Sequence, residues 1–564
     1  MFRDILRAIF MMTTRNDFDR ADTEKLGAMM YALIQNWLRQ NDLEIDWMTS
    51  YADQLLETFV RRMDPSQKYC KYALNTVHSL VEMVERSRYG KRLKEEIINR
   101  AVGVMREMEL YGDRYFIKTS KSKQYVFDLL RRIYNGDDEL RSAFEANDGI
   151  RLLLELLKKE MNELVVYRII RALYAVVCSQ DSSKFGERFA NLGGVQTVSY
   201  LLANPHCSDR VALESIYCLR VVSDLEVVRS ADNKEAISRI LGTLERYNTN
   251  VSFVNVAVDF LGNVAANKDG TANMNKDFIV ECGAIERLVA VLISFESKRE
   301  ESGVKSLLSS IIWALHIFTT SCSTPERTIS ARKQLVYSER APDVLLYELA
   351  NPVDLSSRLC TLNLFIRVVD ADPLNHPPFL FSASGGNASL TDILFEVNSK
   401  TNQKKLIIQK AYALLISLAN CNLNFGSAIR FACSSYQIAD LLLSCPDSDV
   451  IRSTIDFIMF VIKDETVREH LSKDCSLVES LRSLTAQMNE NFFVWRGPVR
   501  EWSDIGEEEA VRKESVCGTN LPVVECYRMS FLSERFPSRE AIWSGTKELG
   551  VVCVDGGSGM ELAT

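Results

Sequence analysis

One pattern recurs along most of this chain: a loop with Gly or Asn, a short apolar helix, a polar turn and a longer apolar helix. Apolar residues spaced three and four apart predict that the longer segments are amphipathic helices. Such short helices cannot close a core by themselves, so neighbouring copies must cover one another's apolar faces. The clearest copies of the longer helix are residues 72–80, 126–134, 170–177, 216–224, 258–267, 311–319, 362–370, 411–419 and 454–462.

The spacing of these copies indicates the kind of stack. Equivalent positions recur at roughly 42 to 54 residues, which is close to the period of armadillo and HEAT repeats. We therefore predict an all-α fold, a right-handed superhelical solenoid of armadillo repeats. The concave face of such a solenoid is a binding surface rather than a reaction pocket, so we expect the function there.

Turn chemistry supports the boundaries between repeats. Glycine can adopt the positive φ that a tight turn after a helix requires. It occurs between predicted helices at 147–150, 191–195, 281–285 and 384–387. Charge predicts a further loop at 298–305, and proline predicts one at 370–378.

The periodicity also sets the predicted domains. We expect residues 1–24 to be an N-terminal extension and residues 25–495 to form the solenoid, with about nine to ten repeats. From about Trp495 the helical pattern fails, and Gly, Ser and charged residues become more common. Residues 496–564 are therefore predicted to be a mostly disordered C-terminal tail.

Composition disfavours several kinds of protein. A formal net charge of −8 argues against direct binding of nucleic-acid phosphates. The fourteen cysteines lack CxxC pairs and zinc-type spacing, so we predict reduced thiols, no metal site and no cofactor. No apolar stretch reaches the roughly 18 residues of a membrane span, and the first residues make a poor signal peptide. We therefore expect no membrane insertion and a location in the cytoplasm and nucleus.

The sequence shows no catalytic motif. An enzyme would need a nucleophile with its base, paired carboxylates, a phosphate-binding glycine loop or metal ligands. His78 and His316 lie in apolar helices without a partner at metal or triad spacing. We therefore predict a protein that is not an enzyme.

Several stretches resemble the β-catenin and plakoglobin family, in the same order along the chain. The longest is 239–288, which includes an Asn–Lys pair before the first helix of the next repeat. Because the matches are collinear, the resemblance implies a divergent β-catenin-like scaffold in which residues 25–495 cover repeats three through twelve. It also implies that the first two repeats and the acidic N-terminal arm are absent. The shorter matches are 72–80, 116–141, 216–224 and 366–379.

The resemblance implies the kind of partner. In that family, long acidic extended segments lie in the groove, so the expected partners are a cadherin cytoplasmic tail, T-cell-factor transcription factors, axin and APC. Cell adhesion, with a location at cell junctions, and Wnt signalling with transcriptional co-activation are the corresponding roles. The family's α-catenin site precedes the repeats, so the resemblance does not extend α-catenin binding to this chain.

The resemblance also names candidate partner-binding residues. Arg141 and Lys276 match two basic clamps for ligand carboxylates, which Arg and Lys bind through charge-assisted hydrogen bonds. Asn263 and Asn267 lie four residues apart on one helix face, and their amides can bind the backbone of an extended peptide. The other matched groove positions are Tyr72, His78, Lys121, Asp128, Arg220 and Arg367.

Simpler interpretations of these residues stay open at this stage. Arg141 and Lys276 could be solvated surface charges, which most exposed charges are. Asn263 and Asn267 could satisfy their own helix turns.

The groove also departs from the family pattern. Tyr217 stands where the family has a groove Trp, and His316 with Ile317 replaces an Arg–His pair. Val221 and Val368 replace groove Asn residues. We therefore expect weaker capture of a peptide backbone in the middle and C-terminal parts of the groove.

Two other kinds of armadillo protein are the alternatives. An importin-like transport adaptor binds basic peptides through a ladder of Trp and Asn, but here only Trp313 occupies such a position and Ile317 stands where the Asn would be. A purely structural armadillo module would have no peptide groove. Binding of acidic and of basic peptides separates the three.

Overall fold

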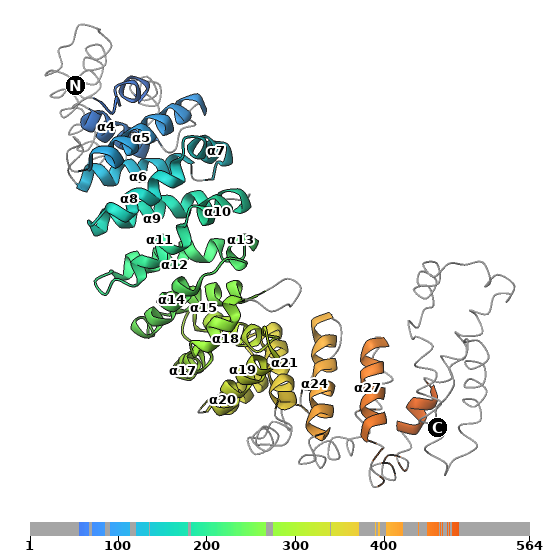
Figure 1. Cartoon of the computed structure of the whole chain (residues 1–564). Helices are drawn as coiled ribbons and strands as arrows, with labels where there is room; N and C mark the ends of the chain where they lie inside the picture. The colour runs from blue at the N-terminus through green and yellow to red at the C-terminus, as the bar shows by residue number, and fades with distance from the viewer. Residues whose placement is uncertain are drawn as a thin grey trace, which may run out of the picture. The chain divides into compact units, whose positions relative to one another are not determined.

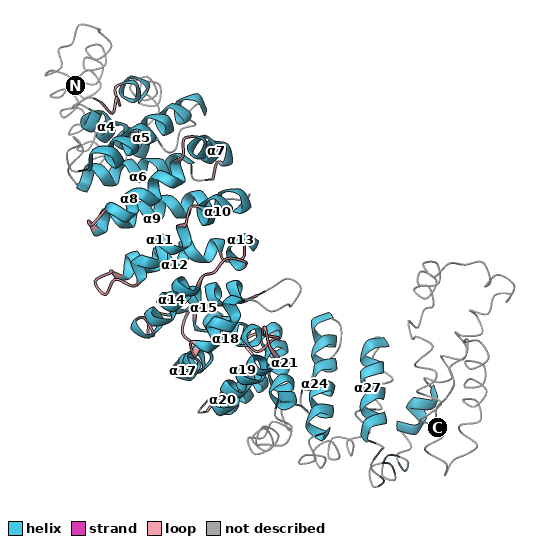
Figure 2. Ribbon diagram, viewed as in Figure 1, coloured by secondary structure: helices cyan, strands magenta, loops and turns pink. Residues whose placement is uncertain are grey.

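The protein's structure, a computed structural model, is all helix and loop in the part of the chain that it describes (Figure 2). The predicted N-terminal extension, the C-terminal tail and most of the proline-rich segment 370–378 lie outside that part. The described residues are 56–66, 70–84, 91–112, 120–134, 136–178, 182–266, 274–338, 340–371, 402–420, 448–461 and 477–483, with isolated positions between 390 and 473.

The chain divides into two compact units, Met1–Ala284 and Ile285–Thr564. Figure 1 labels the helices of both. The described helices of unit 1 are α4 (Cys70–Val84), α5 (Lys91–Tyr111), α6 (Ser120–Tyr134), α7 (Asp138–Ala146), α8 (Gly149–Lys159), α9 (Glu163–Val177), α10 (Ser182–Asn191), α11 (Gly194–Leu202), α12 (Asp209–Val222), α13 (Glu226–Arg229), α14 (Lys234–Arg246), α15 (Val251–Ala265) and α16 (Met274–Glu281). The described helices of unit 2 are α17 (Ala284–Glu296), α18 (Val304–Phe318), α19 (Pro325–Tyr337), α20 (Ala341–Ala350), α21 (Leu355–Ala371), α24 (Asn402–Asn420) and α27 (Ser448–Val461).

Unit 1 is a stack of two rows of helices. The longer helices predicted from the sequence are α4, α6, α9, α12 and α15, and each packs on the next. We call them the long-helix row. A second row, α5, α8, α11 and α14, packs in the same order against it, and α7, α10, α13 and α16 also contact the long helices. We call the surface of the long-helix row that these helices leave uncovered the open face. This arrangement confirms the predicted helices and their stacking.

The sequence of α9 explains how a long helix presents its open face. Asn162 caps the helix because its side chain accepts a hydrogen bond from the Val165 amide at 3.3 Å. Apolar residues at helical spacing, such as Ile169 and Leu173, are buried against the neighbouring helices. Burial of each such side chain contributes about 1.5–3 kcal/mol. The residues between them, including Arg168, therefore face outward.

The turns between repeats follow the glycine prediction in part. At 191–195 Gly193 has a φ of 74° and begins α11, as expected. At 147–150 the left-handed residue is Asp148, with a φ of 61°. The prediction that glycine supplies this turn is wrong there, because Gly149 is needed for packing instead. A Cβ on Gly149 would lie 2.4 Å from the Phe144 ring.

Unit 2 repeats the same construction. Its predicted long helices are α18, α21, α24 and α27, each packed on the next, and α19 and α20 pack against α21. Residues 298–303 of the charged segment form the predicted loop, and residues 304–305 already belong to α18. The predicted turn at 384–387 lies outside the described residues.

Candidate functional site

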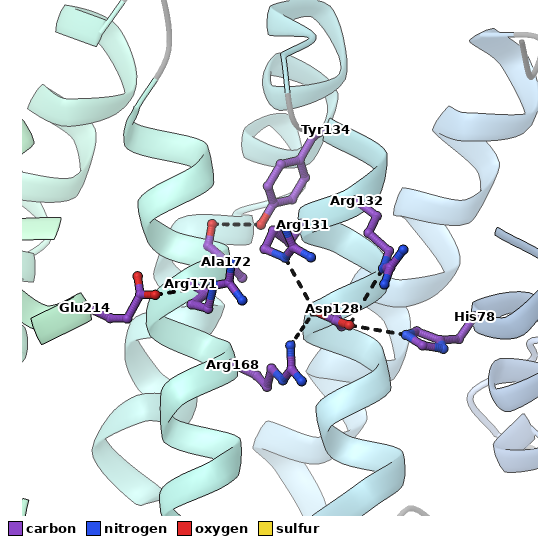
Figure 3. Close-up of polar contacts among 9 residues, drawn as sticks. All are labelled: His78, Asp128, Arg131, Arg132, Tyr134, Arg168, Arg171, Ala172 and Glu214. Carbon is purple, nitrogen blue, oxygen red and sulfur yellow. Dashed lines mark hydrogen bonds and ion pairs between the residues drawn. The ribbon is translucent and has the colours of Figure 1, made fainter. Parts of the chain in front are cut away.

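The open face of unit 1 carries arginines from three consecutive long helices. Arg131 belongs to α6, Arg168 and Arg171 to α9, and Arg220 to α12. Each is paired with a carboxylate, and these carboxylates also lie on the long helices. Figure 3 shows the part of this surface around α6 and α9.

Asp128 lies at the centre of the basic residues in Figure 3. Its Oδ1 atom is 2.9 Å from Arg168 Nη1 and 3.4 Å from Arg131 Nε. Its Oδ2 atom is 3.4 Å from His78 Nε2 and 3.7 Å from Arg132 Nε. Only 8% of Asp128 is exposed, so one buried carboxylate serves basic groups from α4, α6 and α9.

These neighbours keep Asp128 ionised. Burial raises the pKa of the carboxyl, but the hydrogen bond with His78 and the charges of Arg168 and Arg131 outweigh burial. The pKa of Asp128 therefore lies well below its usual range. The His78 ring is held in place from its other side, because it stacks on Tyr125 with the ring centroids 4.3 Å apart.

Two further ion pairs cross between the next helices. Arg171 Nε of α9 lies 3.5 Å from Glu214 Oε1 of α12, and Arg220 Nε of α12 lies 3.4 Å from Asp259 Oδ2 of α15. Burial raises the pKa of Glu214, and the charge of Arg171 opposes this effect. Together with Arg168–Asp128, these pairs link α6, α9, α12 and α15. We call the three pairs the ion-pair ladder.

Aromatic rings lie among the ladder residues. Tyr174 of α9 and Tyr217 of α12 meet edge to face, with the ring centroids 6.5 Å apart. The guanidinium groups of Arg168 and Arg171 lie 5.7 and 5.6 Å from the centroid of the Tyr167 ring. The open face therefore offers apolar contact area next to its charges.

The structure gives Arg141 a different position from the predicted clamp. Its side chain is buried, with 4% of the residue exposed. Arg141 Nε donates to the Ala175 carbonyl at 3.0 Å, Nη2 donates to the Cys178 carbonyl at 3.3 Å, and the guanidinium pairs with Asp138. The clamp prediction for Arg141 is therefore corrected: this guanidinium satisfies carbonyls at the end of α9 and ties α7 to it.

Lys276 is also buried, with 1% of the residue exposed, so its ammonium group is not presented to a ligand as the clamp prediction requires. Its neighbour explains the Asn–Lys pair in structural terms. Asn275 Nδ2 donates to the carbonyls of Arg229 and Ala231 at 2.9 and 3.0 Å, and Asn275 Oδ1 accepts from the Asn233 amide at 3.1 Å. Asn275 thus fastens α16 to α13 and to the turn that follows it.

The predicted asparagines are only partly visible. Asn263 is half-buried on α15, and its Nδ2 atom donates to Ser223 Oγ of α12 at 2.8 Å. One donor of this amide is thereby used inside the protein. Asn267 lies outside the described residues, and so does the side chain of Tyr72.

The remaining predicted residues fall into two groups. Lys121 and Arg220 are exposed on the open face, and Lys121 Nζ lies 5.9 Å from the centroid of the Tyr125 ring. His78 and Asp128 are buried and contact each other. His78 and Asp128 thus contact groups of the protein itself, and the role of these four residues in partner binding stays a prediction.

Arg367, the predicted residue of unit 2, is half-buried on α21. Its Nη1 atom donates to the His316 carbonyl at 2.6 Å and lies 3.3 Å from His316 Nδ1. Burial, with the charges of Arg367 and Lys410, lowers the pKa of His316 to about 3. Burial and the charge of Arg332 lower the pKa of Arg367 to about 10. His316 is therefore neutral at pH 7.

Arg131, Arg168 and Arg171 are not among the binding residues predicted from the sequence. A signal was present, because Arg168 and Arg171 lie three residues apart and therefore share a face of one helix. Their carboxylate partners could not be assigned in the same way. Asp128 lies forty residues before Arg168, and only the stacking of α6 on α9 brings the two together.

Other kinds of site find little support in the part of the chain that is described. A hollow of about 490 Å³ lies between α17 and α19, lined by residues such as Glu286, Lys333 and Tyr337. No group of three His, Cys, Asp or Glu side chains among the described residues is placed to hold a metal ion. No described helix combines the length and the apolar character that a membrane span requires.

Comparison with known proteins gives one related sequence. No protein-family model matches the chain. The chain is 25% identical over 321 residues to the armadillo repeat-containing protein wrm-1 of Caenorhabditis elegans. The match covers 54% of this chain and 37% of wrm-1, so the chain spans little more than a third of that relative.

Solved structures give the same fold. The structure of SYS-1 has a TM-score of 0.54 at 14% identity, and the alignment covers 86% of this chain and 91% of SYS-1. A structure from work on a phosphorylation switch that controls the interaction between cadherin and β-catenin has the same TM-score and sequence identity. That alignment covers 98% of this chain and 99% of the solved chain. These similarities confirm the predicted all-α fold of stacked armadillo repeats.

Proposed function

We propose that this chain, which is similar to armadillo-repeat proteins of the β-catenin type, is a non-enzymatic scaffold that binds acidic, extended segments of other proteins. The open face of unit 1 would hold these segments. The observation that carries this proposal is the local excess of basic side chains on a chain whose net charge is −8. Around the ladder, the basic residues are Lys121, Arg131, Arg132, Arg168, Arg171 and Arg220, and the acidic ones are Asp128, Glu214 and Asp259.

The ladder arginines still have N–H donors that a ligand could use. A guanidinium has five N–H donors, and a single carboxylate contact leaves most of them for other acceptors. Half of the Arg220 side chain and 31% of the Arg168 side chain are exposed. Tyr174 and Tyr217, between these arginines, would contact the apolar parts of an extended segment.

The proposed partners are of the T-cell-factor and cadherin kinds, in Wnt signalling and cell adhesion. A solved complex of SYS-1 with POP-1, which is similar to this chain with a TM-score of 0.52, supports partner binding by this fold, and so does the structure concerned with cadherin and β-catenin. Axin and APC belong to the same proposal through the resemblance of the sequence alone. Such partners would place the protein in the cytoplasm, the nucleus and at cell junctions.

A direct titration tests the proposal. An acidic peptide from a cadherin tail or a T-cell factor is titrated against the protein and against its Arg168→Glu/Arg220→Glu variant. We expect the double charge reversal to weaken binding at least about tenfold, because two attractive contacts become repulsive. Arg188→Glu is the matched control, since Arg188 pairs with Glu145 away from the ladder.

The outcomes separate the classes of protein. Tight binding of a basic peptide in place of the acidic one would indicate an importin-like adaptor. Equal affinity of the two variants for the acidic peptide would mean that the ladder is not the binding surface. A protein that binds neither peptide would be a structural module.

A further inference from the structure

The contacts of Asp128 are those expected of a ligand carboxylate. Both of its oxygens face basic groups, and three of these groups are arginines. Asp128 belongs to the protein, however, so the position that would attract an acidic segment is already occupied by an anion. A carboxylate of a ligand that approaches Arg168 must therefore compete with Asp128.

We propose that Asp128 is an internal counter-ligand, a residue that lowers the affinity of the open face for acidic segments and thereby determines which segments bind. This inference rests on the proposed function. It follows that a segment needs a minimum number of acidic residues to bind. A segment with a single acidic residue does not displace Asp128 from Arg168, whereas a segment with several acidic residues gains enough contacts along the ladder to do so.

Arg168 is the residue through which this competition acts. It lies on α9, whereas Asp128 lies on α6, and their contact at 2.9 Å is the shortest that Asp128 makes with a basic group. The Arg168 side chain is long and 31% exposed, so it can turn toward a ligand without movement of its helix. Asp128 is short and buried, and it stays in place.

When Arg168 leaves Asp128 for a ligand, Asp128 still has other basic neighbours. The carboxylate keeps Arg131, Arg132 and His78 as neighbours after Arg168 has moved to a ligand. A buried carboxylate that lost all of its partners would oppose the exchange strongly. The retained partners therefore make the exchange reversible.

The other two ladder pairs differ in this respect. Among the described residues, Arg171 is the one ion-pair partner of Glu214, and Arg220 is that of Asp259. Transfer of Arg220 to a ligand leaves Asp259 without an ion-pair partner, and transfer of Arg171 leaves Glu214 with the more distant charge of Arg131 and a hydrogen bond from Tyr167. Arg168 is therefore the ladder arginine whose acidic partner keeps the most basic neighbours after a ligand recruits it.

Asp128→Asn in the full chain tests the proposal, because it keeps the shape of the side chain and removes its charge. The probe is a peptide of Glu and Ser residues, and its counterpart with Gln in place of Glu is the control. We expect the variant to bind the acidic peptide about threefold or more tightly than the unmodified protein, with a steeper loss of affinity as salt is added. Its thermal stability should fall, because three arginines lose their shared carboxylate.

These two expected changes have opposite signs, which separates the proposal from a structural role alone. If Asp128 had only a structural role, Asp128→Asn would lower the stability of the protein and would leave its affinity for the acidic peptide unchanged or lower it. Glu139→Gln is the matched control, since it removes one negative charge from the neighbouring helix α7, away from the ladder. An equal gain in affinity in Glu139→Gln would overturn the proposal, because the effect would then come from net charge.

A second variant covers the case in which Asp128→Asn does not fold. In Asp128→Asn/Arg132→Gln the local net charge is that of the unmodified protein, while Arg168 is still released. This variant should also bind the acidic peptide more tightly. If the unmodified protein binds and no folded variant binds more tightly, the counter-ligand is refuted and the proposed function stands. If neither the protein nor its variants bind the acidic peptide, both proposals fail.

Discussion

The two units place their charges differently. In unit 1 the ion-pair ladder lies on the open face, where each pair links consecutive long helices. In the described part of unit 2, Arg367 and Arg332 form no ion pair and donate to the carbonyls of His316 and Thr319. The strong ion pair of unit 2 is inside, between Arg299 and Glu348, whose side chains are 11% and 2% exposed.

The difference shows that similar helix stacks can present different surfaces. A paired arginine on an open face keeps its charge and can exchange its partner. An arginine that is half-buried against carbonyls is fixed by the fold, and the low pKa of His316 beside Arg367 reflects a positive environment with little solvent. We therefore propose that ligands bind to unit 1, and we expect the unit 2 arginines to act mainly on stability.

The largest expected effect comes from the interior of unit 2. Arg299→Ala should destabilise the protein by about 3–5 kcal/mol, because it leaves Glu348 buried without a countercharge. Arg340→Ala is the control, since Arg340 pairs with Glu296 while more than half of its side chain is exposed. Urea denaturation measures both. A loss no larger than that of Arg340→Ala would contradict the contrast between an interior pair and surface pairs.

The next effect compares the units as binding surfaces. Arg168→Glu should weaken binding of an acidic peptide about tenfold, whereas Arg367→Glu should weaken it less than about threefold. The reason is that Arg367 donates to a backbone carbonyl at 2.6 Å and is not available to a ligand. Isothermal titration measures both affinities. A larger loss in Arg367→Glu would move the binding surface to unit 2.

The units should also differ in their response to acid. Below pH 6.5 the unfolded chain protonates His316, but the folded protein does so only near its pKa of about 3. Stability that depends on His316 is therefore lost as the pH falls from about 6.5 toward 3, by up to about 1.4 kcal/mol per pH unit. Asp128, whose folded pKa is lowered, contributes stability that is lost only below its ordinary pKa of about 3.9.

Denaturation at pH 7 and at pH 5 checks this sign. His316→Gln should lose less stability between the two values than the unmodified protein, and Asp128→Asn should lose about the same amount as the unmodified protein. If His316→Gln were as sensitive to acid in this range as the unmodified protein, the burial of a neutral His316 would be wrong.

The smallest expected effect lies in the exposed part of the ladder. Asp259→Asn should change the free energy of unfolding by less than about 0.5 kcal/mol, because Arg220, its partner, is half-exposed and such pairs contribute little. Thermal denaturation gives this value. A loss of several kcal/mol would show that the ladder is needed for stacking of α12 on α15.

The fold could be predicted from the sequence because apolar periodicity is a local property. Every predicted copy of the longer helix, from α4 to α27, lies within a helix of the structure apart from a residue or two at its C-terminal end, and each helix begins earlier than the predicted copy. The buried state of Arg141 could not be predicted in this way. The end of α9 lies more than thirty residues further along the chain, and its carbonyls accept the Arg141 donors only after the repeats have stacked.

The candidate site shows the same limit. The resemblance named Arg220 and Asp128 as candidate binding residues. It could not show that Asp128 forms ion pairs with arginines of the protein itself. Ion pairs between neighbouring repeats join residues about forty positions apart, and many combinations of such residues are possible in a chain with 25% charged residues. Geometry is required to choose among them.

A charge-swap titration tests the central claim most directly. Arg168→Glu/Arg220→Glu is titrated with an acidic extended peptide and with the same peptide carrying Lys at its acidic positions. If the open face of unit 1 holds acidic segments, the variant will bind the acidic peptide at least about tenfold more weakly than the unmodified protein does and will gain affinity for the Lys peptide. Unchanged affinity for the acidic peptide, with no gain for the Lys peptide, would contradict the claim.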